Sequence, residues 1–364
     1  MEKVYTLDKL DKKILKALME NARYSYSAIA KMVGTKREVV TYRIKRLVEN
    51  GVIEQFTMSL NWTKIGFKFM PHIFMKLGIV SQERMQEITS KLCEHKYIII
   101  VSGCEGTFNL YVRPLCKNET HLRKILNEIK TICGLDLLDY EIVDVLTDNY
   151  APGLFFLDGE DIKLKNVIDK GGSFQSLLKK TYQQKSPTLK NGQLDSLDLK
   201  IFDLLQENSR ISLRDLAKST NSEIMTVKNR IQSLIKKKIL YCFNLVLNTE
   251  KLGYQEYDLL IRLYGTEEEQ KRVVQSIKNH KNCYYLALCN SRWDFLFLFQ
   301  VKNTEELKKM INEILLKHKN VIVKYEIVWY TKLYKQISFP SPLSKTYHEK
   351  ITLPLKRVVH PIDK

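Results

Sequence analysis

Residues 7–15 read Leu-Asp-Lys-Leu-Asp-Lys-Lys-Ile-Leu, and residues 194–202 read Leu-Asp-Ser-Leu-Asp-Leu-Lys-Ile-Phe. The second stretch repeats the pattern Leu-Asp-x-Leu-Asp-x-Lys-Ile of the first stretch 187 residues later. Each stretch places a carboxylate just ahead of apolar residues spaced three and four apart, which is typical of the start of an amphipathic helix. A chain that contains the same helix start twice is a candidate for an internal duplication.

The repeat extends over most of the chain. It needs no gap from Leu7 to Gly66, and the offset then changes from 187 to 185 residues. The matching segments include Asn21-Ala22-Arg23 with Asn208-Ser209-Arg210, Phe108-Asn109-Leu110 with Trp293-Asp294-Phe295, and Tyr140-Glu141-Ile142-Val143 with Tyr325-Glu326-Ile327-Val328. Agreement over this length indicates two copies of one unit, joined head to tail.

Breaks in the pattern suggest the domain boundaries. Gly171-Gly172 and Ser186-Pro187 lie between the copies and indicate a linker, in which a short helix near residues 174–182 is an option. We predict helical domains at 1–60 and 194–248, mixed domains at 61–150 and 249–335, a linker at 151–193 and an irregular tail at 336–364.

The composition fits several domains and a polyanionic partner. Of the 364 residues, 44% are hydrophobic, which is enough to bury several cores. The formal net charge is +18 at pH 7, and such an excess of cations favours binding to a phosphate polymer. The alternative is a Lys-rich surface that serves solubility alone.

The sequence also argues against several classes of protein. It has no run of about 18 apolar residues and no apolar signal core at its start, so we predict a cytoplasmic protein without a membrane partner. The seven cysteines form no Cys-x-x-Cys pair and the seven histidines show no ligand spacing. We therefore predict no metal, no cofactor and no catalytic residue.

The first domain of each copy reads as three short helices. Asp8 is a candidate N-cap for the first helix, and Gly34 gives the freedom in φ that a tight turn after the second helix requires. Thr35 and Glu38 have the spacing of a capping box at the start of the third helix, which Asn50-Gly51 ends. This arrangement predicts a helix-turn-helix domain.

The third helix of the first copy is basic, as expected for a helix that lies in the major groove of DNA. Its N-terminal residues would contact base edges, and Arg43, Lys45 and Arg46 would contact phosphates or form structural pairs. An ordinary three-helix bundle with a basic face is the alternative. The candidate DNA-binding residues are Thr35, Lys36, Arg37, Val40, Thr41, Arg43, Lys45 and Arg46.

The second copy differs at this helix. Glu223 and Ile224 stand where the first copy has Lys36 and Arg37. A carboxylate is repelled by phosphate, although it can accept a hydrogen bond from cytosine. We predict a weaker or differently specific DNA reader, with a degenerate copy kept for packing as the alternative. Its candidate DNA-binding residues are Ser222, Thr226, Lys228 and Arg230.

The second domain of each copy has the order βαββαβ, which predicts an α+β, ferredoxin-like fold. In the first copy, strands are expected at 69–79, 97–101, 108–115 and within 135–146, and the second copy repeats this order up to about residue 329. Such a sheet has one face covered by helices and one free face, which must be covered. We predict that the two copies pair within the chain through these faces.

Several motifs together resemble the leucine-responsive regulator (Lrp/AsnC, feast/famine) family. They are Leu7 to Leu15, Asn21 to Arg23, Ile29 to Lys31 and Arg43 to Ile53. The resemblance covers nearly the whole chain except the linker and tail. It implies a transcription regulator that binds double-stranded DNA, contains ligand-sensing domains, and can assemble into larger homo-oligomers.

The resemblance also implies an amino acid or a related small molecule as effector, bound at loops of the sensing domains. The family's loop often reads Gly-x-Tyr-Asp, and each copy here keeps one half of this signature. A simple β-turn is the alternative reading. The candidate ligand-binding residues are Gly106, Phe108, Asn109, Ser291, Trp293 and Asp294.

Two other functions remain open from the sequence. Siroheme decarboxylases share this architecture and can occur as fused pairs. Their His-Asn-Tyr and Arg motif would fall on residues that lack the expected side chains, namely Ile100, Val101, Ser102 and Cys104, and Tyr285, Leu286, Ala287 and Cys289. The other alternative is an interaction scaffold that does not bind DNA. Two unlike readers on one scaffold predict an asymmetric DNA site.

Overall fold

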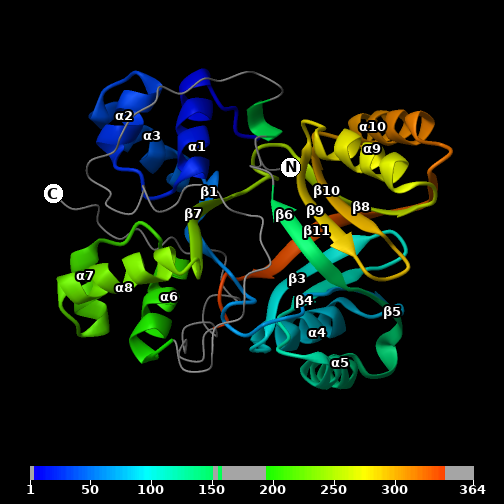
Figure 1. Ribbon diagram of the computed structural model, residues 1–364. Coiled ribbons are helices and arrows are strands. Elements are labelled where there is room, and N and C mark those ends of the chain that lie inside the picture. The colour runs from blue at the N-terminus through cyan, green and yellow to red at the C-terminus, as the bar shows by residue number, and fades with distance from the viewer. Residues whose placement is uncertain (1–3, 151–154, 158–193, 341–364) are drawn as a thin grey trace.

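The computed structural model describes residues 4–150, 155–157 and 194–340, and it contains two units of like topology (Figure 1). The first unit comprises α1 (Lys9–Glu20), α2 (Tyr26–Val33), α3 (Arg37–Glu49), β1 (Ile53–Leu60), β2 (His72–Leu77), α4 (Gln82–Glu94), β3 (Ile98–Glu105), β4 (Leu110–Pro114), α5 (Glu119–Cys133), η1 (Gly134–Asp136), β5 (Leu137–Val143), β6 (Val145–Tyr150) and η2 (Phe155–Leu157).

The second unit repeats this order. It comprises α6 (Ser196–Glu207), α7 (Leu213–Thr220), α8 (Ile224–Lys236), β7 (Leu240–Leu247), β8 (Gln255–Leu263), α9 (Glu267–Lys278), β9 (Cys283–Cys289), β10 (Phe295–Val301), α10 (Thr304–Lys317) and β11 (Ile322–Gln336). The predicted α+β class, with a helix-turn-helix domain followed by a ferredoxin-like domain in each copy, is confirmed.

The repeated Leu-Asp-x-Leu-Asp motif starts α1 and α6 in the same way. Asp8 accepts hydrogen bonds from the backbone N–H groups of Leu10 (2.9 Å) and Asp11 (2.8 Å), and the Asp11 side chain accepts from the N–H of Asp8. Asp195 and Asp198 form the equivalent capping box. The prediction of Asp8 as the N-cap is confirmed, because both carboxylates satisfy N–H groups that the helix itself leaves unpaired.

The turn before the third helix also follows the sequence in part. Gly34 has a φ of 78°, and its equivalent Asn221 has a φ of 51°, so both occupy the left-handed region. The predicted capping box of Thr35 and Glu38 is wrong. The N-cap of α3 is Lys36, which makes no side-chain capping hydrogen bond, so the helix begins one residue later than that box requires.

The two helical domains are joined by a two-stranded antiparallel ribbon. Strand β1 of the first unit pairs with β7 of the second unit, with Phe56 opposite Leu245. Side chains of each unit complete the other unit's helical core, because Met58 and Leu60 pack beneath α6–α8, whereas Leu245 packs beneath α1–α3. Neither helical domain therefore has a complete core of its own.

The remaining nine strands form one sheet in the order β5-β2-β4-β3-β11-β8-β10-β9-β6. Each unit keeps the ferredoxin-like order within its own four strands. The last strand of each unit then continues into the other. Strand β11 pairs first with β8 and then with β3, and β6, which follows β5 after Asp144, pairs with β9. This exchange makes the two mixed domains one structure.

Each unit contributes most of one half of this sheet. Helices cover the outer face of each half, and the inner faces of the two halves lie against each other (Figure 1). Helices α4 and α5 pack on the first unit's strands, whereas α9 and α10 pack on those of the second unit. The layer between the inner faces is a core shared by both units, in which Phe74 and Tyr111 meet Leu260, Tyr285 and Trp293. The predicted pairing of the two copies within the chain is confirmed.

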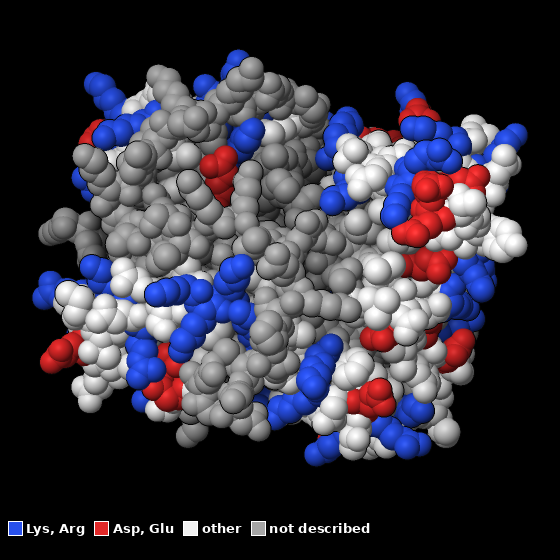
Figure 2. All heavy atoms as spheres, in the orientation of Figure 1, with Lys and Arg blue, Asp and Glu red and all other residues white. Residues whose placement is uncertain are grey.

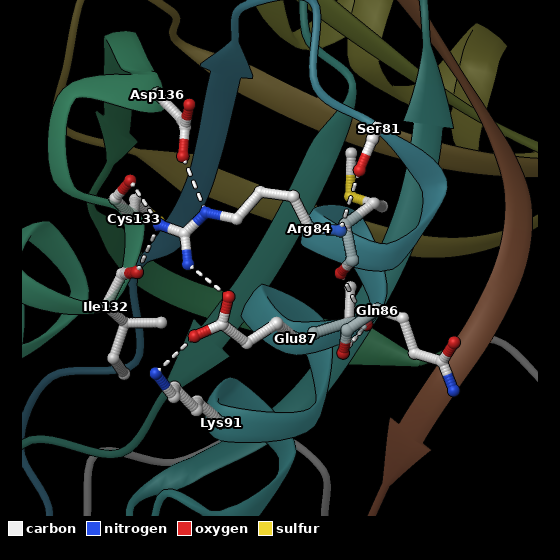
Figure 3. A network of polar contacts seen from close by, with 10 residues as sticks. Ser81, Arg84, Gln86, Glu87, Lys91, Ile132, Cys133 and Asp136 are labelled. Atoms are coloured by element: carbon white, nitrogen blue, oxygen red, sulfur yellow. Dashed lines mark hydrogen bonds and ion pairs between the residues drawn. The ribbon is translucent and has the colours of Figure 1, made fainter.

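Arg84 fastens α4 to the end of α5 (Figure 3). Its guanidinium donates to the backbone oxygens of Ile132 (3.2 Å) and Cys133 (3.0 Å), and it pairs with Asp136 (2.7 Å) and Glu87 (2.8 Å). A cation at the end of α5 satisfies carbonyl groups that lack partners within the helix. This network fixes the helical layer on the first unit.

Parts of the predicted linker and tail lie outside the described residues, including the optional helix at 174–182 and everything after residue 340. Phe156 and Leu157, at the start of the predicted linker, are buried against α1–α3. Phe339, in the predicted tail, packs among α6–α8. None of the helices in the described ranges is long and apolar enough to cross a membrane.

Candidate nucleic-acid interface

The first helix-turn-helix domain, here called reader one, consists of α1–α3. Helix α3 buries Val40, Ile44 and Leu47 against α1 and α2. These residues are spaced four and three apart, so they form the inner face of the helix and leave the opposite face exposed. The interpretation of Val40 as a base-contacting residue is wrong, because its side chain is 0% exposed.

Two cations of α3 hold the helix in place. Arg43 pairs with Asp8 and with Asp11 (3.2 Å), and Arg46 pairs with Asp11 (2.8 Å). The hydrogen bond to Asp8 raises the pKa of Arg43. Arg230 makes the equivalent pairs with Asp195 (2.8 Å) and Asp198 (3.5 Å) in the second unit. The sequence allows Arg43 and Arg46 either to contact phosphates or to form structural ion pairs, and these contacts favour structural ion pairs.

Other candidates of reader one lie at the surface. Lys36, Arg37 and Lys45 are exposed, and Thr41 is half-buried with its hydroxyl donating to the carbonyl oxygen of Arg37 (3.0 Å). Thr35 is half-buried in the turn before the helix. Lys36 and Arg37 stand at the N-terminal end of α3, which is the end that approaches base edges in a helix-turn-helix complex.

The second helix-turn-helix domain, here called reader two, consists of α6–α8. Thr226 is exposed on α8, Lys228 is half-buried, and the Ser222 hydroxyl donates to the carbonyl oxygen of Thr220 (3.3 Å). Figure 2 shows Lys and Arg side chains gathered over the part of the surface that α6–α8 occupy. Lys236, Lys237 and Lys238 are exposed at the end of α8. This positive surface suits a phosphate backbone.

A reciprocal pair of arginines locks the two readers together. Arg23 donates to the carbonyl oxygen of Ser209, and Arg210 donates to those of Ala22 and Tyr24 (3.0 Å). The backbone repeats this symmetry, since the N–H of Ala22 donates to Phe243 (2.9 Å) and the N–H of Ser209 to Phe56 (2.7 Å). Each turn between the first two helices of a reader therefore docks on the other reader.

The same arginines lie against aromatic rings of the ribbon and the opposite unit. The Arg23 guanidinium is 5.2 Å from the ring centre of Phe243, and that of Arg210 is 4.6 Å from the ring centre of Tyr26. Burial and the charge of Arg210 lower the pKa of Arg23 to about 10. The sequence contains the motif Asn-x-Arg in both copies, which marks these two arginines. No local pattern, however, predicts that each arginine contacts the other copy.

The candidate effector residues have internal partners. Asn109 accepts from the N–H of Leu77 (2.8 Å) and donates to its carbonyl oxygen (2.9 Å), and Asp294 accepts from the N–H of Leu263 (2.7 Å). Phe108 and Trp293 are buried in the core between the sheets. Gly106 and Ser291 are exposed. The loop thus serves as a turn, and its role in effector binding stays a prediction.

A buried polar cluster in the core between the sheets was not predicted. Burial and the nearby Arg113 hold the pKa of His72 well below its usual range. The neutral ring lies between the hydroxyls of Tyr111 (3.0 Å) and Tyr285 (3.1 Å), and Arg113 also donates to Tyr285 (3.1 Å). The cluster joins both units and satisfies polar groups that have no access to water.

Asp258 lies in the same layer and is 0% exposed. It accepts a hydrogen bond from Tyr330, and burial raises its pKa to about 8. The signal for this layer was a charged residue with apolar neighbours on both sides in a strand, as at Asp258 between Tyr257 and Leu259 and at Arg113 between Val112 and Pro114. Such residues are almost always paired when they are buried.

Comparisons with known proteins support the assignment of both readers. A winged helix-turn-helix DNA-binding family matches residues 7–54, and the AsnC-type helix-turn-helix domain matches residues 194–235. The chain is 31% identical over 138 residues to an uncharacterized HTH-type transcriptional regulator of Pyrococcus abyssi, covering 38% of this chain and 91% of that protein. It is also 31% identical over 130 residues to the HTH-type transcriptional regulator FL11 of Pyrococcus furiosus, covering 36% of this chain and 84% of the relative.

Solved structures of one enzyme resemble both units at once. The crystal structure of the siroheme decarboxylase NirDL matches with a TM-score of 0.60 and covers 94% of this chain and 97% of that chain. The sequence identity is 14%, so this likeness shows the fold alone. The sequence matches show the family, because 91% of a relative is covered at 31% identity. This chain belongs to the Lrp/AsnC family of helix-turn-helix transcription regulators.

Proposed function

We propose that this chain is a sequence-specific DNA-binding transcription regulator that reads one operator with two unlike helix-turn-helix domains. The observation that carries this proposal is the locked pair of readers. The ribbon, the shared cores and the hydrogen bonds of Arg23 and Arg210 to the opposite unit fix the separation and orientation of α3 and α8. Two recognition helices at a fixed separation match two half-sites at a fixed spacing on a duplex.

The composition of the two helices supports an asymmetric operator. Reader one presents Lys36 and Arg37 at the start of its recognition helix, whereas reader two presents Glu223 and Ile224. A dimer of identical readers favours a palindrome, and this chain has no identical pair. We therefore propose Lys36, Arg37, Thr41 and Lys45 as the main DNA contacts of reader one.

The test is recovery of genomic fragments by the purified full chain, followed by affinity measurements against salt concentration. Sequence-enriched fragments are expected, with log affinity falling by about 0.9 per log unit of salt for each phosphate contacted. The double variant K36A/R37A should lose the sequence preference in the half-site that reader one contacts. K308A/K309A is the matched control, because it removes two exposed lysines from α10, far from either reader along the chain.

The outcomes separate the alternatives. Binding without sequence enrichment would indicate a general DNA-packaging role, and a selection that returns only perfect palindromes would contradict the asymmetric operator. A full chain that binds no DNA would overturn the proposal and favour an interaction scaffold.

Two further properties belong to the proposal and rest on family membership. An amino acid or a related small molecule would modulate DNA binding, and pseudo-dimers would assemble further in the cytoplasm. Operator affinity measured across a panel of amino acids tests the first property. Light scattering with and without the active amino acid tests the second.

We also propose that the chain is not an enzyme. The positions that a siroheme decarboxylase motif would occupy lie on β3 and β9, and most of their side chains are buried, such as Val101, Cys104 and Ala287. None of the eight side chains at these positions is a cation that could pair with propionate groups, and the hydroxyls of Ser102 and Tyr285 are hydrogen-bonded within the protein. Addition of siroheme, monitored by absorbance and by product analysis, should give no decarboxylation, and turnover would overturn this statement.

A further inference from the structure

The exposed faces of the two recognition helices carry different chemistry. The face opposite the buried residues of α3 contains Glu38, Tyr42 and Lys45, which are spaced four and three apart. The internal repeat places the exposed Met225 and Asn229 and the half-buried Gln232 at the equivalent positions of α8. We call these two sets stripe one and stripe two.

Stripe one has the groups that recognise G·C pairs. Lys45, together with Lys36 and Arg37 at the helix start, supplies cationic donors, and guanine presents two acceptors in the major groove. Glu38 is an exposed acceptor, and the cytosine amine is a donor. Tyr42 is 62% exposed at the centre of the stripe, where it adds contact area.

Stripe two has the groups that recognise A·T pairs. Asn229 and Gln232 carry amides, which match the paired donor and acceptor of adenine. Met225 is 57% exposed, and Ile224 beside it is 48% exposed. Large apolar side chains at the start of a recognition helix match the thymine methyl group, which is the apolar feature of the major groove.

The charge of reader two fits this assignment. The N-terminal end of α8 has Glu223 where α3 has Lys36, while Lys236, Lys237 and Lys238 are exposed at the other end. The exposed positive charge of this helix therefore lies toward its C-terminal end, where phosphate contacts are expected. With a carboxylate near the groove entrance, discrimination at the start of this helix depends on shape and apolar contact more than on cationic donors.

We propose that the operator has two halves of different base composition, a G·C-containing half read by stripe one and an A·T half read by stripe two through thymine methyl groups. This inference rests on the proposed function. It assigns specificity to Met225, Ile224 and Asn229, which no feature of the fold itself requires at the surface.

The experiment is selection from a randomised duplex library with the full chain, followed by replacement of each thymine in the recovered site by uracil. Loss of one methyl group removes about 0.8 kcal/mol of apolar contact, so affinity should fall about fourfold for each contacted methyl. The loss is expected in one half only. In M225A the same replacement should have a smaller effect on affinity, because only Ile224 then remains to contact thymine methyl groups.

Two variants complete the test. N229A should reduce discrimination for adenine about tenfold at one position. The exchange variant M225E/N229Y/Q232K should shift the preference of reader two from A·T pairs toward G·C pairs. E38A is the matched control, because it changes the equivalent position of reader one and should leave the thymine-to-uracil effect unchanged.

The inference and the proposed function fail in different ways. Sequence-specific binding to two halves of like composition overturns the inference alone, as does a thymine-to-uracil effect that persists undiminished in M225A. A chain that selects no sequence at all overturns the proposed function and the inference with it.

Discussion

Arg23 and Arg210 each reach across the molecule to the backbone of the other's turn, although 187 residues separate them in the chain. Their partners are the carbonyl oxygens of Ser209, Ala22 and Tyr24. The charge of Arg210 also lowers the pKa of Arg23, as expected when two cations lie close together. The contact thus combines attraction to backbone dipoles with repulsion between like charges.

This arrangement predicts non-additive effects of substitution. R23A should reduce the free energy of unfolding by about 1–3 kcal/mol, because the Ser209 carbonyl loses a donor. R210A should act similarly. The double variant should be more destabilised than the two single losses added together, because each single variant relieves the same repulsion, which the double variant relieves only once. Urea denaturation measures all three, and strict additivity would contradict the coupling.

The same contacts should set the permitted spacing of half-sites. In wild type, operators with one or two base pairs inserted between the halves should bind poorly, because each base pair rotates one half relative to the other. R23A/R210A should tolerate such insertions better, at a lower peak affinity. Binding assays across a series of spacer lengths test this, and the control is K308A/K309A, which should retain the wild-type preference.

Lys238 is a site where glycine should improve stability. It has a φ of 55°, and its equivalent in the first unit is Gly51, with a φ of 69°. The left-handed conformation costs a residue with a Cβ roughly 1–2 kcal/mol, so K238G should raise the free energy of unfolding by about 1 kcal/mol. The neighbouring Lys237 has a φ of −74°, and K237G should lower stability instead. Equal effects of the two changes would contradict the argument.

Asp258 should make stability depend on pH between about 4 and 8. Burial raises its folded-state pKa to about 8, well above the value of about 3.9 for an unfolded chain. The folded protein thus binds this proton more tightly, and the associated stability is lost as the pH rises toward 8. D258N should remove that loss. Melting temperatures at pH 5 to 9 test this, with E105Q, an exposed carboxylate on β3, as control.

Lys335 should act in a separate pH window. Its buried ammonium donates to the carbonyl oxygens of Cys93 (2.7 Å) and His95 (2.9 Å) at the end of α4, and burial lowers its pKa to about 8. The charged form is disfavoured by folding, so stability should rise as the pH increases from about 8 to 10.4. K335M should lack this rise. The two melting curves would contradict the argument if they shifted in parallel across that range.

The sequence predicted the elements of this fold but not their partners across the units. Capping residues such as Asp8 and apolar spacings act over a few residues, so α1–α3 and the βαββαβ order could be read directly. The length of β11 could not be predicted, because Lys332 and Lys335 in its second half obscure the alternation of apolar and polar residues that indicates a strand. Its pairing with β3 depends on residues more than 200 positions away.

The candidate site was predicted in the same uneven way. Lys36, Arg37 and Lys45 were placed at the surface by helical periodicity alone. Val40 failed because it lies four residues before Ile44 and seven before Leu47, and this spacing places it on the buried face of the helix. The ion pairs of Arg43 with Asp8 and Asp11 join residues more than 30 positions apart, which the spacing within α3 does not encode.

Mutual completion of the cores has a consequence for how the protein behaves when it is scarce. In a regulator made of separate subunits, the DNA-competent form is governed by mass action and declines as copies per cell decline. Here Met58 of the first unit packs into the second helical domain, and Leu245 of the second unit packs into the first, within one polypeptide. The pairing of the two readers is therefore unimolecular and does not depend on the protein concentration. A cell with only a few molecules of this chain would still have nearly all of them paired for DNA binding.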